Sequence, residues 1–237
     1  MEYRCIFKRL EKKYLLTEKQ YLDIRAFLEK YTYTDKYGKS SIRNIYFDTD
    51  DYSLIRASIE KPVFKEKLRL RSYGSPDKNG AVFLEIKRKY NGIVYKRRAP
   101  MTLQAADDFL YSQNPNRVSS QILKEIDWFL KLYSPEKKIF ISYDREALFS
   151  KEDQNLRITF DTNIGFRTSN LDLTDNSSLH YILPADRYLM EIKIPASMPL
   201  WLCSYLSHKE IFPISFSKYG KCYCNFIFQN LGGLNYA

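Results

Sequence analysis

Hydrophobic and polar residues alternate with a period of two along much of this chain. The clearest example is the segment Phe64–Tyr73, in which apolar and positively charged residues occupy alternate positions. Its cations share one parity and are Lys65, Lys67, Arg69 and Arg71. Because successive side chains of a β-strand point to opposite faces, this segment is predicted to be a strand with one apolar and one cationic face. Like charges at this spacing repel one another, so we expect a polyanion to lie against the cationic face.

Other segments have the alternation and the β-rich composition of strands. They are residues 7–16, 43–48, 82–90, 93–98, 139–149, 156–161 and 188–194. The dipeptide Asn91-Gly92 joins two of them and is typical of a hairpin turn. The sequence therefore predicts about eight strands, most of them antiparallel neighbours.

Helical periodicity is rarer in this chain. Thr17 and Gln20 have the spacing of a capping box, which predicts a helix that continues to about residue 30. The other predicted helices are residues 102–112, 119–132 and 219–230. Two loops, residues 75–80 and 172–186, are predicted to be exposed or flexible. No segment has the composition of a linker, so residues 1–237 are predicted to form a single domain.

The charge of the chain is concentrated on the predicted strands. Lys and Arg number 38 and Asp and Glu number 28, which gives a net charge of +10 and favours acidic partners. Cations on the polar parity of the strands account for nearly all of this excess. For a single strand of this kind, the simplest interpretation is that its polar residues face water. A solvated face usually mixes charge types, however, whereas these faces are cationic with isolated carboxylates.

About eight antiparallel strands can close into a barrel that holds one elongated ligand. We therefore predict an α+β fold, namely an antiparallel eight-stranded β-barrel tunnel with flanking α-helices. If the charged faces point inward, the tunnel is cationic, and its buried charges must be paired or must bind a ligand. A chain of phosphates, with Mg²⁺ or Mn²⁺ on the few carboxylates, would meet this requirement.

Several chemistries are absent from the sequence. The chain has two histidines, neither at metal-ligand spacing, and it has no P-loop, so a histidine base and a Walker-type site are excluded. The N-terminus has no apolar signal region, and the longest uncharged run, residues 194–207, is too short to span a bilayer. The four cysteines form no C-x-x-C pair and are expected to be reduced. We therefore expect a cytoplasmic protein.

Nine short motifs with charged residues follow one another along the chain. They are Arg9-Leu-Glu11-Lys-Lys13-Tyr14, Ile45-Tyr-Phe-Asp48, Lys67-Leu-Arg69-Leu-Arg71-Ser-Tyr73, Leu84-Glu85-Ile-Lys87, Tyr95-Lys96-Arg97-Arg98, Tyr143-Asp-Arg145-Glu-Ala147, Leu156-Arg157-Ile-Thr-Phe-Asp161, Glu191-Ile-Lys193 and Phe216-Ser217-Lys218-Tyr219. In this order they resemble the VTC-type polyphosphate polymerase domain, a branch of the triphosphate tunnel metalloenzymes. The resemblance covers roughly residues 3–228.

The resemblance implies an eight-stranded tunnel that binds a nucleoside triphosphate and releases polyphosphate. It implies catalytic roles for Lys13, Arg69, Arg71, Arg145 and Lys218. It implies substrate-binding roles for Lys67, Lys87, Lys96, Tyr143, Arg157, Lys193 and Ser217. Glu191 would hold Mn²⁺ or Mg²⁺, and Glu11 and Glu85 are further possible metal ligands. Eukaryotic members of the family carry an inositol-phosphate sensing domain and a membrane anchor, and we expect this chain to be a free-standing form without them.

The reaction implied by the resemblance is transfer of the γ-phosphate of ATP to a growing polyphosphate chain. The attacking phosphate is already anionic, which agrees with the lack of a histidine base. One alternative is a metal-dependent hydrolase of triphosphate or tripolyphosphate on the same tunnel, with water as the nucleophile. A second is a non-catalytic module, or an inactive relative, that binds polyphosphate or single-stranded nucleic acid. For the nucleic-acid case, Tyr73, Tyr90 and Tyr95 lie among cations and could stack bases.

The products separate these alternatives, since a polymerase forms ADP and a polymer and a hydrolase releases orthophosphate. We expect ATP and polyphosphate as partners and no nucleic acid. The sequence leaves the oligomeric state and the preferred metal open.

Overall fold

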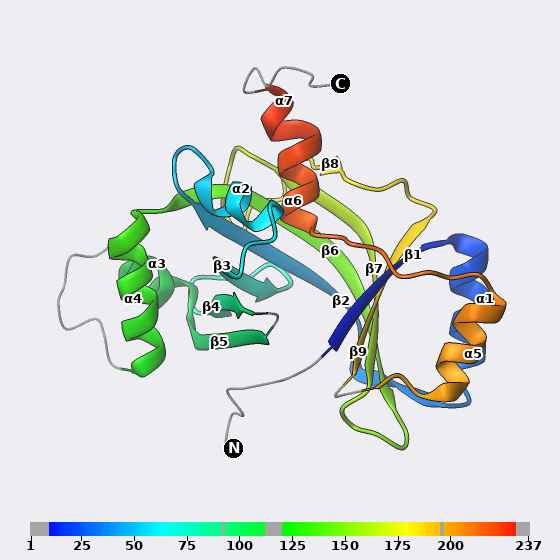
Figure 1. The fold of residues 1–237 in the computed structure, drawn as a ribbon. Coiled ribbons are helices and arrows are strands. Elements are labelled where there is room, and N and C mark those ends of the chain that lie inside the picture. Colours follow the sequence, from blue (N-terminus) through cyan, green and yellow to red (C-terminus); the bar gives the residue numbers. More distant parts are fainter. Residues whose placement is uncertain (1–9, 92, 112–119, 195–196, 231–237) are drawn as a thin grey trace.

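The alternating segments form one antiparallel sheet in the computed structural model, which describes residues 10–91, 93–111, 120–194 and 197–230 (Figure 1). The strand order is β1-β9-β7-β6-β2-β3-β4-β5, and β8 pairs with β7. The strands are β1 (Leu10–Thr17), β2 (Thr32–Asp48), β3 (Phe64–Tyr73), β4 (Ala81–Tyr90), β5 (Ile93–Thr102), β6 (Glu136–Ser150), β7 (Arg157–Arg167), β8 (His180–Tyr181) and β9 (Arg187–Ile194).

Each of the eight predicted strand segments lies within or overlaps a strand of this sheet. The main difference is β2, which begins at Thr32, well before the predicted start at residue 43. The predicted residues 7–9 lie outside the described part of the chain. The two-residue strand β8 was not predicted, because a pairing this short has no alternation to detect.

The register places the predicted charged positions on one face of the sheet, here called the charged face. Lys67 of β3 pairs with Lys87 of β4, which pairs with Lys96 of β5. On the other half of the sheet, Lys13 of β1 pairs with Glu191 of β9. The alternation therefore predicted the two faces of the sheet correctly, because residues that pair across neighbouring strands point to the same face.

Two pairs of helices cover the opposite, apolar face. Helices α1 (Glu18–Leu28) and α5 (Leu200–His208) pack on β1, β9 and β7 around Ile24, Leu202 and Met190. Helices α3 (Leu103–Tyr111) and α4 (Gln121–Tyr133) pack on β3, β4 and β5 around Phe129 and Leu84. Figure 1 shows these two pairs at opposite sides of the molecule. The charged face is thus free of α1, α3, α4 and α5.

A third core covers the charged face where β2 ends and β6 begins. It is built by α2 (Ser53–Ile59), α6 (Lys218–Cys222) and a π-helical turn (Tyr223–Ile227), which continues into α7 (Phe228–Asn230). Ile141 of β6 and Phe166 of β7 belong to this core together with Tyr219. At this end, apolar contacts replace charges on the same face of the sheet.

The prediction of a closed eight-stranded barrel is wrong. The sheet has nine strands, and within the described residues β1 pairs with β9 and β5 with β4, so the two edges do not join. The outer edge of β1 instead forms a bridge between Lys13 and Ile214, in the segment that leads to α6. Alternation reports the face of a side chain, whereas closure depends on where two distant edges meet.

The open sheet is nevertheless strongly curled. Lys13 on β1 contributes to lowering the pKa of Lys67 on β3, although the two strands are five positions apart in the sheet order. In a flat sheet they would be about 24 Å apart. The charged face is therefore concave, with cations from β1 and β3 turned toward each other.

The predicted helices are confirmed where the structure describes them. Thr17 and Gln20 form the capping box of α1, and Ser120 caps α4. The predicted C-terminal helix is present as α6, the π-helical turn and α7. Residues 112 and 119 lie outside the described part of the chain. Helices α2 and α5 were missed, because each is short and lacks a strong polar stripe. No helix among the described residues is long and apolar enough to cross a membrane.

The loop of residues 172–186, predicted to be exposed or flexible, is largely exposed and is anchored by side chains of the sheet. Arg43 of β2 donates a hydrogen bond of 2.7 Å to the carbonyl of Leu173. Arg167 of β7 donates one of 2.9 Å to the carbonyl of Asp172. Leu173 itself is buried in the core under α3 and α4. The side chains that hold the loop are distant in sequence, so local composition did not reveal them.

Asp48 links α2 and α6 to the end of β2. Its buried carboxylate accepts hydrogen bonds from the backbone N–H groups of Leu54 and Ile55 and from the Tyr219 hydroxyl, at 2.8–3.0 Å. We expect Asp48→Ala to lower the free energy of unfolding by about 3 kcal/mol, because three buried donors lose their acceptor. Urea denaturation measures this change. Asp50→Ala, at an exposed carboxylate, is the control and should change stability by about 0.5 kcal/mol or less. Equal midpoints for both variants would contradict the role of Asp48.

Candidate functional site

Asp161 of β7 is a fully buried carboxylate on the charged face, and two cations share it. Arg145 of β6 binds it bidentately, with Nε–Oδ1 and Nη2–Oδ2 distances of 2.6 and 2.7 Å. Lys218, at the start of α6, places Nζ 2.6 Å from Oδ2. Burial alone would raise the pKa of Asp161, but Arg145 and Lys218 lower it below its usual value. Asp161 therefore connects β6, β7 and α6 through charge-assisted hydrogen bonds.

Glu191 of β9 and Glu11 of β1 form a second acidic centre beside the first. Lys193 Nζ lies 3.9 Å from a carboxylate oxygen of each, and Lys13 Nζ lies 2.7 Å from Glu11 Oε1. Arg145 Nη2 lies 3.3 Å from Glu191 Oε2. Burial would raise the pKa of Glu191, but Lys193, the Glu11 carboxyl group and Arg145 hold it well below its usual range. Two carboxylates thus face the same cations.

Glu85 of β4 organises a third group on the other half of the sheet. Its carboxylate lies 2.7 Å from Arg69 Nε and 2.7 Å from Lys96 Nζ, and Arg71 Nε lies 3.9 Å away. Glu85 is almost fully buried, which would raise its pKa, but these three cations hold the pKa well below its usual range. One carboxylate therefore offsets the charge of three cations only in part.

Tyr143 of β6 joins the two halves of the charged face. Its hydroxyl accepts a hydrogen bond of 3.2 Å from Arg71 Nη2. The Arg145 guanidinium and the Lys218 ammonium lie 5.1 and 4.4 Å from its ring centre, within the range of a cation–π interaction. Burial would raise the pKa of Tyr143, but these cations lower it. Asn44 of β2 completes the contact by accepting a 2.8 Å hydrogen bond from Arg71 Nε.

Three lysines form one row across β3, β4 and β5. Lys67, Lys87 and Lys96 pair in register, and only Lys96 has a carboxylate partner among the described residues. Desolvation and the nearby Lys65 and Lys87 lower the pKa of Lys67 to about 7. The ring of Tyr219 lies 6.0 Å from Lys67 Nζ. This lysine row is the part of the charged face where positive charge is least compensated.

Besides Glu85 Oε1, which has Lys96 as an ionic partner, two buried polar atoms on the charged face have no hydrogen-bond partner among the described residues. They are Nε of Arg157 and Oγ1 of Thr159, on neighbouring inward positions of β7. Thr159 pairs with Glu191 and Arg157 with Lys193, so both lie beside the second acidic centre. Buried polar groups in native proteins are rarely left unpaired. Their position therefore favours a polar ligand on this part of the face.

Ser217 has a structural contact as the N-cap of α6. Its hydroxyl accepts a 3.2 Å hydrogen bond from the backbone N–H of Gly220. A Cβ at position 220 would lie 3.2 Å from this oxygen, so glycine allows the close approach. The predicted role of Ser217 in substrate binding stays a prediction.

The residues predicted as metal ligands divide between two of these groups. Glu11 and Glu191 lie together, whereas Glu85 is enclosed by Arg69, Arg71 and Lys96. No cluster of three or more metal-ligating side chains occurs in the described ranges. Mg²⁺ is commonly held by one or two carboxylates together with substrate phosphates and water. The pair Glu11 and Glu191 fits such an ion, and Glu85 does not.

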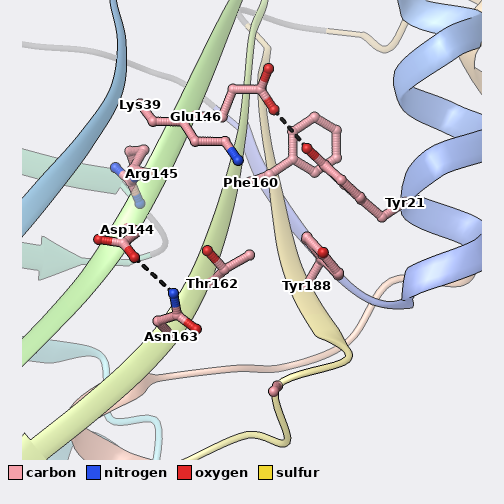
Figure 2. A pocket seen from close by; sticks show the side chains of 10 residues that line it. Tyr21, Lys39, Asp144, Arg145, Glu146, Phe160, Thr162, Asn163 and Tyr188 are labelled. Atoms are coloured by element: carbon pink, nitrogen blue, oxygen red, sulfur yellow. Dashed lines mark hydrogen bonds between the residues drawn. The ribbon is translucent and has the colours of Figure 1, made fainter.

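A pocket of about 180 Å³ lies away from the charged face, next to α1 (Figure 2). Figure 2 shows two hydrogen bonds in its wall, from Tyr21 to Glu146 at 3.0 Å and from Asn163 to Asp144 at 2.8 Å. Arg145 is its single lining residue among the predicted site residues. This pocket is therefore a feature separate from the predicted site.

The fold and site define an α+β protein whose curled antiparallel sheet carries a polycationic concave face. The chain belongs to the VTC domain family, since the VTC domain model matches residues 8–227. No curated protein matches the chain significantly.

Solved structures show a related fold at low sequence identity. A candidate adenylate cyclase from Bacillus halodurans is 14% identical with a TM-score of 0.54, over 90% of this chain and 95% of that chain. A candidate adenylyl cyclase from Hippeastrum, described as having a dominant triphosphatase activity, is 17% identical with a TM-score of 0.49, over 95% and 97% of the two chains. The first of these likenesses shows a shared fold.

Sequence reasoning missed three residues of this site. Asp161, Asn44 and Thr159 were not among the predicted site residues, although each contacts or adjoins residues that were. Asp161 and Thr159 share the inward parity of Arg157, and this signal was available in the sequence. Asn44 lies just before the Ile45-Tyr-Phe-Asp48 motif, but nothing local to it indicated a contact with Arg71.

The low pKa of Lys67 predicts a pH-dependent affinity for polyanions. Below pH 7 the free protein carries this charge, and above pH 7 a bound anion must restore it, so affinity falls as pH rises from about 7 to 9. Isothermal titration with tripolyphosphate at several pH values measures this fall. The matched variant Lys67→Arg keeps its charge at all these pH values, so the remaining contributions come from Lys96, whose pKa burial also lowers to about 7, and from the ligand itself. A pH slope for Lys67→Arg as steep as that of the wild type would contradict the assignment.

Proposed function

We propose that this chain is a metal-dependent phosphotransferase that moves the γ-phosphate of ATP to a growing polyphosphate chain. The observation that carries this proposal is the excess of cations on one concave face, most of all the lysine row, where two of three lysines have no carboxylate partner among the described residues. A fold gains no stability from such a row. A long polyanion neutralises it, and membership of the VTC domain family supports phosphate polymers as that polyanion.

The arrangement suits phosphoryl transfer, which depends on positioning and on charge neutralisation. The guanidinium groups of Arg69, Arg71 and Arg145 are held by carboxylates or polar side chains, so they are oriented before substrate arrives. Planar guanidinium groups bind phosphate oxygens bidentately. Lys13 and Lys218 stand on the half of the face that carries the acidic centres, where they would orient the attacking phosphate.

A divalent cation fits this proposal at Glu11 and Glu191. When bound there with substrate phosphates, Mg²⁺ or Mn²⁺ would supply Lewis-acid stabilisation of developing charge. Lys193, which lies 3.9 Å from both carboxylates, would then be released toward a phosphate oxygen. The buried Thr159 hydroxyl beside Glu191 could donate to the same ligand.

The second function to be tested is hydrolysis of triphosphate or tripolyphosphate on the same face. The charged face would bind both substrates, and the two functions differ in the nucleophile, which is phosphate in one and water in the other. Incubation with ATP and Mn²⁺, followed by polymer staining on a gel and by ADP and orthophosphate assays, separates them. Polymer with ADP supports the polymerase, and orthophosphate without polymer supports the hydrolase. A cytoplasmic location stays a prediction.

Adjacent lysines on β1 provide a matched pair of variants. Lys13 lies on the charged face and the exposed Lys12 on the other. We expect Lys13→Ala to lower turnover of ATP about 100-fold or more, since one oriented cation contributes on the order of 3 kcal/mol to charge stabilisation. Lys12→Ala should have turnover within about twofold of the wild type. Equal losses in the two variants would show that net charge, and not the charged face, is responsible.

Removal of one carboxylate tests the metal assignment. Glu191→Gln keeps the shape of the side chain but loses the charge that would bind a cation, so we expect metal-dependent turnover to be lost and binding of Mn²⁺ to weaken. Electron paramagnetic resonance of Mn²⁺ measures binding independently of activity. Glu85→Gln, in the group that does not fit a metal, should keep Mn²⁺ binding. Wild-type binding of Mn²⁺ by Glu191→Gln would refute the site.

A further inference from the structure

The row of cations on β3 ends in aromatic side chains at the end of the charged face away from the lysine row. Beyond Arg71, which pairs with Phe83 of β4, the next inward residue is Tyr73, the last residue of β3. The Tyr73 ring meets the Phe83 ring edge-on, with ring centres 5.8 Å apart. The Arg98 guanidinium of β5 lies 4.8 Å from the centre of the Phe83 ring. Aromatic faces and a guanidinium plane thus stand directly beside the predicted phosphate ligands.

Tyr73 also approaches the opposite wall of the curled sheet. It contributes to the electrostatic environment of Arg157 on β7, although β7 lies three positions from β3, the strand of Tyr73, in the sheet order. Arg157 lies over the ring of Phe149 at 4.9 Å, and its buried Nε has no hydrogen-bond partner among the described residues. The charged face is therefore bordered here, on both walls, by an arginine that lies over an aromatic ring.

The exposure of Tyr73 indicates an available surface. Tyr73 is 52% exposed, whereas Tyr143, farther along the same face, is 3% exposed. Along a strand each residue advances the chain by about 3.4 Å, so Tyr73 stands about 7 Å from Arg71 and about 14 Å from Arg69. A ligand whose phosphate tail lies on the two arginines would have its other end at Tyr73.

We propose that Tyr73, Phe83, Arg98 and Arg157 form an aromatic rim that binds the nucleoside part of a nucleoside triphosphate. The inference rests on the proposed function, because it assumes that Arg69 and Arg71 bind the triphosphate. Aromatic rings and guanidinium planes stack on any base, so the rim selects nucleotides over inorganic polyphosphate and discriminates weakly among bases. Inorganic polyphosphate has no base to stack on the rings of Tyr73 and Phe83. These rings therefore give the donor nucleotide a binding position at the end of the face away from the lysine row.

The test compares two ligands on the full chain. Isothermal titration is carried out with the non-hydrolysable ATP analogue adenylyl imidodiphosphate and, separately, with inorganic tripolyphosphate. We expect Tyr73→Ala to weaken the nucleotide about 10-fold or more and to change tripolyphosphate affinity less than twofold. Tyr73→Phe, which keeps the ring, should bind both ligands like the wild type. Tyr90→Ala is the matched control, since Tyr90 ends β4 with similar exposure, 56%, on the other face of the sheet.

The outcomes separate the rim from the function on which it rests. If the wild type binds neither ligand, the proposed function fails and the rim fails with it. If tripolyphosphate binds but Tyr73→Ala leaves nucleotide affinity unchanged, the rim is overturned and the proposed function stands. Equal weakening of both ligands also overturns the rim, because it assigns Tyr73 to polyanion binding or to folding. Circular dichroism of each variant shows whether the sheet is intact.

Discussion

Mutual repulsion of cations on one face of a sheet is the constraint around which this protein is built. The sheet tolerates it by sharing few carboxylates among many cations. Asp161 is divided between Arg145 and Lys218, and Glu85 among Arg69 and other cations. Each carboxylate is buried, so its interactions act at low effective dielectric and are strong. The face is thereby held together but remains positive, which leaves it complementary to a polyanion.

Different helices cover the two faces of the sheet. Four of them cover the apolar face and form two cores, while α2, α6 and the π-helical turn fill one end of the charged face. Lys218 and Tyr219, neighbours at the start of α6, bind Asp161 and Asp48 respectively. The position of α6 is therefore coupled to the same carboxylate that orients Arg145. The start of α6 therefore takes part both in the apolar core at this end of the face and in the ionic contacts of Asp161.

The kind of side chain changes from one end of the charged face to the other, and the functional proposal depends on this order. The lysine row, in which only Lys96 has a carboxylate partner among the described residues, lies at one end. Arginines held by carboxylates or amides lie in the middle, and aromatic rings lie at the other end. Oriented arginines suit a reacting triphosphate, since their geometry is set before substrate binds. A lysine ammonium, a point charge on a four-carbon stem with several rotatable bonds, suits a polymer that must move. The match to the VTC domain family agrees with this proposal. The physical argument for it comes from the contacts of the side chains.

The sequence by itself determined the faces of the strands, because side-chain alternation is local and survives in every pairing. It therefore revealed the cationic row from Lys65 to Arg71 and the capping box at Thr17. Only the tertiary structure decided that the sheet stays open and curls, that Glu85 is enclosed while Glu11 and Glu191 lie together, and that Asn44 meets Arg71. These depend on which distant strands become neighbours and where edges end, and no local pattern of residues encodes either.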